Sequence, residues 1–379
     1  MTVRRSKVQT QSPALQRLTA AGAVTGEAVK AFLAAHSFPL VEGTLITWVY
    51  VGDAASLALR HWIYGLASSQ PMVRVPGTDL WTVTLDIPPK SRVEYKLERN
   101  GELIEDPLNP LRARDPFGAN SVVHTPGYET PDFIVPDPEA REGLLDDHVV
   151  DGRQVRVYLP ARLRKTRRYP LLVVHDGSDY LRYTAMKTIL DNLIHRLEIP
   201  DLVVAFTSSG DRLREYANDA GHARWLTERL VPKLEKILPL IGKPQGRGLM
   251  GASFGAVASL ATAWRAPGFY GRLLLQSGSF AFTDIGKSNH RGPLFDPIVE
   301  FMNKFRARPL LVAEKVFLSC GVYESLIYEN RSLVPLLQAT GMDVRFVEAR
   351  DGHNWENWRD RLRDGLSWLF PGPLLLVYE

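Results

Sequence analysis

The chain has 379 residues and a formal net charge of +4, with 45% hydrophobic and 23% charged residues, which is close to the average of soluble globular proteins. This composition excludes a fibrous or low-complexity chain, and the length predicts two or three domains. No apolar run approaches the length of a membrane-spanning helix. No apolar segment follows the basic residues of the first eleven positions. We therefore expect no secretory signal, no membrane span and a cytoplasmic location.

The charge distribution gives little support for a nucleic-acid partner. Residues 1–145 contain 14 basic and 16 acidic residues, so the positive excess lies in the rest of the chain. There the basic residues alternate with acidic ones, and the densest run, at 162–168, is typical of a solvated loop. The positive excess of the larger half favours an anionic small-molecule ligand. Spacings typical of metal ligands are absent from the sequence, so we expect neither a metal site nor a cofactor. The only cysteine, Cys320, ends an apolar strand and is interpreted as a buried small hydrophobic residue.

The first third of the chain predicts a short helical segment followed by a β-sandwich. Residues 13–36 have a helical pattern, and period-two strands begin after Gly43. Asn100-Gly101 lies between two such strands and predicts a tight hairpin. The strands are expected at residues 44–52, 56–62, 71–75, 79–88 and 91–107. We predict a helical segment at 1–36, a β-sandwich domain at 37–125 and a proline-rich, acidic linker at 126–143.

From residue 144 to 379 the pattern predicts an α/β domain. A hairpin with Asp151-Gly152 at its turn comes first, followed by alternating apolar strands and helices. Such alternation predicts a doubly wound, mostly parallel sheet with right-handed crossovers. The later strands are expected at residues 169–177, 201–209, 246–251, 271–278, 314–321 and 342–349, and the helices at 189–199, 222–238, 254–266, before Gln338 and at the C-terminus.

One motif in this domain indicates chemistry. Gly251-Ala252-Ser253-Phe254-Gly255 has the pattern G-x-S-x-G, and it joins a predicted strand to a predicted helix. In that context the pattern is the nucleophile elbow of an α/β-hydrolase. The turn is so tight that only glycine fits two positions before the serine and two positions after it. We therefore predict the α/β-hydrolase fold, with Ser253 as nucleophile.

A serine nucleophile needs a base, which in this fold is a histidine after the last strand. His353 meets this requirement, whereas His175 precedes the serine in the chain. An acid should follow the preceding strand, and Glu324 lies three residues after Gly321. Asp343 and Asp351 remain alternatives for this acid, and a Ser–His pair without a strong third member remains possible.

The oxyanion hole of such a site is expected to be formed by backbone N–H groups. One donor would be Phe254, the residue after the nucleophile, and the other Gly177 or Ser178, in the loop after the strand at 169–177. Asp176 is interpreted as a cap of that loop.

These residues resemble the esterase D-like α/β-hydrolases, and more closely the enterochelin (enterobactin) esterases. The resemblance depends on GASFG at 251–255, QSGSF at 276–280 and DGHNWENW at 351–358. GDRLREY at 210–216 and DPLNPLRARDPFGANSV, which leaves the sandwich, are also similar, so that nearly the whole chain is covered. The sandwich resembles the E-set domain that precedes the esterase domain in that family.

The resemblance implies a serine esterase that hydrolyses a ferric catecholate trilactone, such as ferric enterobactin, through an acyl-enzyme, so that iron is released. It implies Ser253 as nucleophile, His353 as base, Glu324 as acid, and contacts of Arg214 and Trp358 with the anionic substrate. Feruloyl, acetyl-xylan and generic carboxylic esters remain alternative substrates, and a non-catalytic binding protein is the alternative outside the enzymes. The sequence does not determine the oligomeric state.

Overall fold

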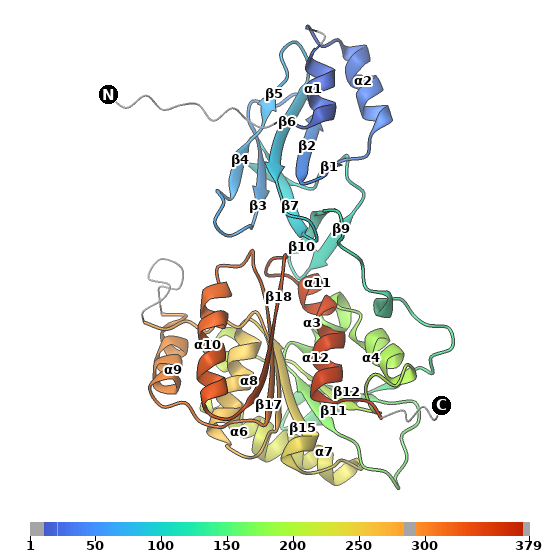
Figure 1. Ribbon diagram of the computed structural model, residues 1–379. Helices are drawn as coiled ribbons and strands as arrows, with labels where there is room; N and C mark the ends of the chain where they lie inside the picture. The colour runs from blue at the N-terminus through green and yellow to red at the C-terminus, as the bar shows by residue number, and fades with distance from the viewer. Residues whose placement is uncertain (1–10, 21, 284–292, 374–379) are drawn as a thin grey trace, which may run out of the picture. The chain divides into compact units, whose positions relative to one another are not determined.

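The computed structural model describes residues 11–20, 22–283 and 293–373, and it contains two compact units (Figure 1). The first unit comprises residues up to Thr130 together with Arg350–Gly352. The second comprises Pro131–Ala349 and the chain from His353 onward. The division falls at residue 130, inside the segment expected to be a linker. The first ten residues, on which the expectation about a secretory signal depends, lie outside the described residues.

The first unit contains two antiparallel sheets preceded by two helices, α1 (Pro13–Ala20) and α2 (Gly26–Ala35). One sheet has the order β1-β2-β6-β5, and the other has the order β4-β3-β7-β10-β9, with β8 paired to β7. The buried rings of Trp48 (β2) and Tyr95 (β7) meet edge to face with centroids 5.7 Å apart, so the two sheets share a core. The predicted antiparallel β-domain is thereby confirmed. The strands are β1 (Leu40–Glu42), β2 (Leu45–Val51), β3 (Leu57–His61), β4 (Ser69–Pro71), β5 (Val73–Arg74), β6 (Leu80–Asp86), β7 (Arg92–Arg99), β8 (Glu102–Ile104), β9 (Arg112–Asp115) and β10 (Gly118–His124).

Both predicted hairpins are present. Asn100 and Gly101 have φ angles of 53° and 86° between β7 and β8. Asp151 and Gly152 have φ angles of 49° and 79° between β11 and β12. Two successive positive φ angles define the turn type whose twist matches that of the flanking strands.

The second unit is built on an eight-stranded mixed sheet with the order β11-β12-β14-β13-β15-β16-β17-β18. Neighbours from β14 to β18 pair in parallel, and β11 and β12 are antiparallel at one edge. The predicted doubly wound, mostly parallel sheet is confirmed by this strand order. The strands are β11 (Leu144–Val150), β12 (Arg153–Leu159), β13 (Leu171–Val174), β14 (Val203–Thr207), β15 (Arg247–Ala252), β16 (Arg272–Gln276), β17 (Lys315–Gly321) and β18 (Asp343–Ala349).

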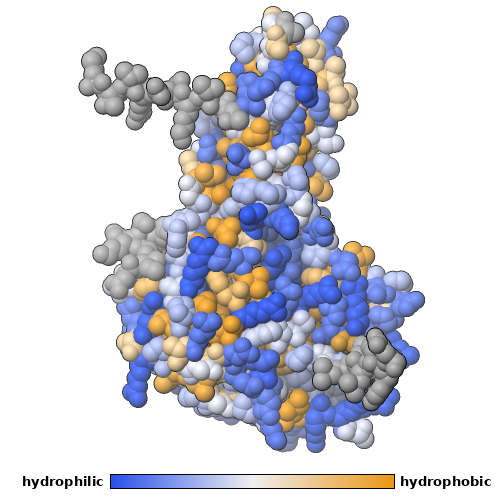
Figure 2. Space-filling model, viewed as in Figure 1, coloured by the Kyte–Doolittle hydropathy of each residue, from blue (hydrophilic) through white to orange (hydrophobic). Residues whose placement is uncertain are grey.

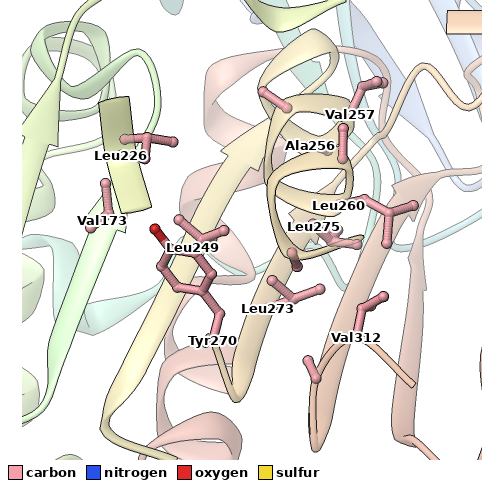
Figure 3. Close-up of a cluster of buried hydrophobic side chains, with 14 of the residues drawn as sticks. Val173, Leu226, Leu249, Ala256, Val257, Leu260, Tyr270, Leu273, Leu275 and Val312 are labelled. Carbon is pink, nitrogen blue, oxygen red and sulfur yellow. The ribbon is translucent and has the colours of Figure 1, made fainter. Parts of the chain in front are cut away.

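Helices cover both faces of this sheet, as Figure 1 shows. Successive residues of β13 illustrate the division, since Val173 packs into one apolar cluster whereas Leu172 and Val174 pack into the other. The first cluster joins the sheet to α6, α8, α9 and α10, and part of it is seen in Figure 3. The second joins the sheet to α3, α4, α11 and α12. The helices are α3 (Gly177–Tyr183), α4 (Met186–His195), α5 (Arg212–Tyr216), α6 (Ala220–Arg224), α7 (Val231–Ile237), α8 (Phe254–Arg265), α9 (Asp296–Ala307), α10 (Ile327–Ala339), α11 (Trp355–Asp360) and α12 (Leu362–Leu369).

Several helical features differ from the expectation. Helix α3 follows β13 directly, where only a loop was expected, and α9 was not expected at all. The buried residues of α9 recur at helical spacing (Ile298, Phe301, Met302, Phe305), so a signal was present in the sequence. The helix expected at 222–238 is divided into α6, a π-helical segment (Trp225–Leu230) and α7. Pro232 lies at the start of α7 and has no N–H to donate, which interrupts the α-helical ladder there.

The face of the molecule seen in Figure 2 is mostly hydrophilic, with smaller hydrophobic areas between the polar ones. Among the described residues, no helix combines the length and the apolar character needed to cross a membrane.

Two buried histidines lie side by side behind the carboxyl end of β13. Nε2 of His175 is 3.1 Å from Nε2 of His222, and Nδ1 of His175 is 3.0 Å from the carbonyl oxygen of Met250. This pattern fits two neutral rings, with His175 donating from Nδ1 and accepting at Nε2. Burial lowers the pKa of His175 from 6.5 to about 4. Burial, and after it the charges of His175 and Arg153, lower the pKa of His222 further.

We expect this pair to make the protein sensitive to acid. The folded-state pKa values lie below that of an unfolded histidine. The contribution of the neutral pair to the free energy of unfolding is therefore fully present above about pH 6.5 and is lost as the pH falls toward about 4. For His175 alone the loss between about pH 7 and about pH 5 is about 2 kcal/mol. Thermal unfolding followed by circular dichroism at these two pH values should show a lower Tm at the lower pH. His222→Gln should reduce this difference, whereas His195→Gln, at an exposed position, should leave it unchanged. Equal pH dependence in the wild type and His222→Gln would contradict the assignment.

Candidate active site

Ser253 lies at a strained turn between β15 and α8. Its backbone has φ 56° and ψ −119°, a conformation that residues other than glycine rarely adopt. The turn is tight, because a methyl group on Gly251 would lie 2.4 Å from backbone atoms of Gly255. Since α8 begins at Phe254, the N–H of this residue is among the helix's first four, which have no partner within the helix. The structure thus has the elbow geometry that the sequence motif predicts.

A histidine and a carboxylate meet at the carboxyl end of the same sheet. Nδ1 of His353 lies 2.7 Å from Oε2 of Glu324. Glu324 is 3% exposed and follows β17, whereas the His353 side chain is 39% exposed and follows β18. A carboxylate on Nδ1 fixes the tautomer in which Nε2 can accept a proton.

The other oxygen of Glu324 is held by several donors. Oε1 accepts hydrogen bonds from the N–H of Gly321 at 2.7 Å, from Oγ of Ser277 at 2.7 Å and from Nδ2 of Asn357 at 3.3 Å. Such hydrogen bonds keep a buried carboxylate oriented toward its partner.

The two alternative acids lie elsewhere. Asp343 is exposed at the first position of β18, and the parallel strands place it at the opposite end of the sheet from His353. Asp351 belongs to the first unit, where the fully buried guanidinium of Arg92 lies 3.3 Å from its carboxylate. Of the three carboxylates, Glu324 is the one whose side chain is hydrogen-bonded to His353.

The QSGSF segment supports both halves of this arrangement. Oγ of Ser279 is 3.2 Å from Oγ of Ser253, and Oγ of Ser277 donates to Glu324. Gly278 exchanges two hydrogen bonds with the side chain of Asn330 on α10, which fixes the turn. Sequence reasoning used this segment only as a mark of resemblance and did not identify the individual roles of Ser277, Ser279 and Asn330. Among the described residues, Oγ of Ser253 is hydrogen-bonded to Ser279 and not to His353. A hydrogen bond between a nucleophile and its base often forms only when substrate binds.

The two residues expected to contact substrate lie in different surroundings. Trp358 is 5% exposed, its indole N–H donates to Oγ of Ser277 at 3.0 Å, and its ring meets that of His353 edge-on at 5.1 Å. In this position it packs behind His353 and Ser277 and is shielded from solvent. Arg214 lies exposed on the short helix α5. The ring of Trp358 also meets that of Trp355 at 4.8 Å, and Trp355, which is half-buried, meets the ring of Tyr183 at 5.7 Å.

The expected oxyanion loop follows β13, the neighbour of β15 in the sheet. Asp176 has a left-handed backbone (φ 53°), and α3 begins at Gly177. A methyl group on Gly177 would lie 2.4 Å from Cβ of Phe206, so the loop packs too closely for another residue there. Oγ of Ser178 is 3.2 Å from Oγ of Ser208. A methyl group on Gly255 would be 3.6 Å from Oδ2 of Asp176, so this loop and the elbow lie against each other.

The carboxylate of Asp176 was interpreted as a cap of its loop, but it makes no capping hydrogen bond to α3. It pairs instead with Arg212 on α5, a residue that the sequence did not single out. In the described part of the chain, no group of three or more His, Cys, Asp or Glu residues is placed to hold a metal ion.

Comparisons with known proteins show which family the chain resembles. A family model described as "Putative esterase" matches residues 150–369. The iron(III) enterobactin esterase of Dickeya dadantii is 24% identical over 356 residues, covering 80% of each chain. The iron(III) enterobactin esterase of Escherichia coli O6:H1 is 25% identical over 351 residues, covering 81% of this chain and 85% of the relative. Among solved structures, the ferric enterobactin esterase of Salmonella typhimurium superposes with a TM-score of 0.72 at 20% identity, covering 86% of this chain and 93% of that one.

Proposed function

The chain belongs to this esterase family, and we propose that it is a serine esterase which cleaves the ester bonds of a catecholate siderophore trilactone of the ferric enterobactin type. Its membership makes it a carboxylic ester hydrolase. The observation that carries the proposed catalytic role is the hydrogen bond between His353 and the buried Glu324, at the sheet edge where Ser253 occupies its elbow. The proposed substrate is supported by relatives that are enterobactin esterases over about four-fifths of the chain.

In the proposed mechanism, Oγ of Ser253 attacks the ester carbonyl carbon while Nε2 of His353 takes the hydroxyl proton. Glu324 stabilises the imidazolium that forms. The negative charge on the carbonyl oxygen is stabilised by the N–H of Phe254 and by an N–H of Gly177 or Ser178. The bond from the carbonyl carbon to the seryl oxygen then breaks, His353 protonates that oxygen so that it leaves as a hydroxyl, and the acyl group remains on Ser253. Water activated by His353 hydrolyses this acyl-enzyme and restores the serine.

Iron enters this proposal as part of the substrate. Hydrolysis of the trilactone converts one hexadentate ligand into separate catecholate arms, which lowers its affinity for iron. The net positive charge of the chain beyond residue 145 suits an anionic ferric complex. A cytoplasmic location, where released iron can be used, belongs to the same proposal.

The role of Glu324 is tested by Glu324→Gln. An amide at this position favours the wrong tautomer of His353 and cannot stabilise its cation, so kcat for ester hydrolysis should fall by about 10³–10⁴. Asp343→Asn, at the opposite end of the sheet, is the matched control and should leave kcat unchanged. Steady-state kinetics with a p-nitrophenyl ester measures both. If Asp351→Asn lowered kcat strongly and Glu324→Gln did not, the acid would be Asp351.

The substrate is tested by mass spectrometry of the products formed by the wild type and by Ser253→Ala. The substrates are ferric enterobactin, the iron-free trilactone, methyl ferulate and a short p-nitrophenyl ester. Dihydroxybenzoylserine products formed only by the wild type are the expected result, because the variant lacks the nucleophile but keeps the fold.

Two results would change the proposal. Hydrolysis of methyl ferulate or the simple ester with both trilactones untouched would keep the catalytic residues and replace the substrate by a carbohydrate-linked or generic ester. Undiminished hydrolysis by Ser253→Ala would remove Ser253 from the mechanism.

A further inference from the structure

A buried carboxylate lies beside the elbow and is paired with one arginine. The side chain of Asp176 is 8% exposed, and that of Arg212 is 40% exposed. Nε of Arg212 is 2.9 Å from Oδ1 of Asp176, and NH2 is 2.8 Å from Oδ2, which is the two-pronged geometry of a strong arginine–carboxylate pair. Among the described residues, Arg212 is the only cation that is hydrogen-bonded to this carboxylate.

The carboxylate of this pair lies next to the proposed oxyanion loop and close to the elbow. Asp176 directly precedes Gly177, and its carboxylate approaches Gly255 in the first turn of α8. Its backbone N–H donates to the hydroxyl of the buried Tyr216, one turn after Arg212 on α5. The loop is therefore tied to α5 by both its backbone and its side chain.

The charge of Asp176 affects its surroundings. Burial, followed by the negative charge of Asp176, raises the pKa of Asp179 in the first turn of α3. A carboxylate this close to the elbow would also oppose the negative charge that forms on the substrate's carbonyl oxygen. That opposition is greater in the transition state than in the bound ester, because the ester oxygen is uncharged. An uncompensated Asp176 would therefore lower kcat more than it would raise KM.

We propose that Arg212 is a positioning residue for catalysis: it neutralises Asp176 and holds the loop of Gly177 and Ser178 against the elbow, so that the backbone N–H groups face the oxyanion without a competing negative charge. Arg212 acts through Asp176 and need not touch the substrate. This inference depends on the proposed role of Ser253.

The experiment compares Arg212→Gln, Asp176→Asn and the double variant by steady-state kinetics with a p-nitrophenyl ester. Arg212→Gln should lower kcat by about 100-fold, the size of an oxyanion-hole defect, with KM changed less than about threefold. Asp176→Asn in that background removes the uncompensated charge, so the double variant should recover at least about tenfold in kcat. Arg212→Lys keeps the charge and should retain kcat within about tenfold.

The matched control is Arg247→Gln. Arg247 makes a similar two-pronged pair with Glu235, at 2.7 and 2.9 Å, but it lies at the amino end of β15, away from Ser253. Its loss should leave kcat unchanged, which separates the local effect from the general cost of losing an ion pair. Circular dichroism establishes that each variant is folded.

Three results would overturn the inference: kcat within about threefold of the wild type for Arg212→Gln, a double variant no faster than Arg212→Gln, or a loss of about 100-fold in folded Arg212→Lys. If Arg212→Gln does not fold, Arg212→Lys is measured alone: a kcat within about tenfold of the wild type supports the inference, and a loss of about 100-fold in the folded variant overturns it. Full activity of Ser253→Ala would instead reject the proposed function, so the two failures can be told apart.

Discussion

The arrangement of the site depends on one buried carboxylate. Glu324 orients His353 with one oxygen and accepts hydrogen bonds from Gly321, Ser277 and Asn357 with the other. These partners come from β17, from the loop after β16 and from α11. Trp358 then bonds to Ser277 and packs edge-on against the histidine ring. A carboxylate removed from water needs such partners, and here the partners are the segments that surround the catalytic groups. Satisfying Glu324 therefore also assembles the site.

The sheet explains why these segments meet. From β14 to β18 all neighbouring strands are parallel, so the loops after β13, β15, β16, β17 and β18 leave the sheet at the same edge. Each loop carries one of the proposed groups: the oxyanion donor, the elbow, the supporting serines, the acid and the base. Crevices at the carboxyl ends of parallel strands are the usual positions of sites in open α/β sheets. The apolar clusters on both faces keep the strand ends in register, so the loops can differ in chemistry without loss of the scaffold.

Much of this was predictable from the sequence because some signals are local. The G-x-S-x-G pattern at a strand-to-helix junction has one geometric interpretation, and chain order then left His353 as the candidate base and Glu324, Asp343 and Asp351 as candidate acids. What could not be predicted depends on contacts between distant segments. Arg212 and Asp176 are 36 positions apart, and nothing in either neighbourhood indicates their pairing. Helix α9 had a helical pattern of buried residues, whereas α3 is so short that its periodicity carries little information.

The side chains that support the proposed base are more deeply buried than the aromatic side chains around them. Glu324 and Trp358 are buried and each is hydrogen-bonded to the buried Ser277, so in the proposed mechanism they would act in the same way on any ester that reaches Ser253. Tyr183 and Trp355 are half-buried, with rings 5.7 Å apart, and the guanidinium of Arg182 lies 5.2 Å from the ring centroid of Tyr183. A guanidinium beside aromatic rings can bind a flat anionic group, whereas the electron-rich ring faces alone would repel one. Under the proposed function, the choice of substrate therefore depends on such partly exposed side chains, and the proposed set of Ser253, His353 and Glu324 is compatible with many esters.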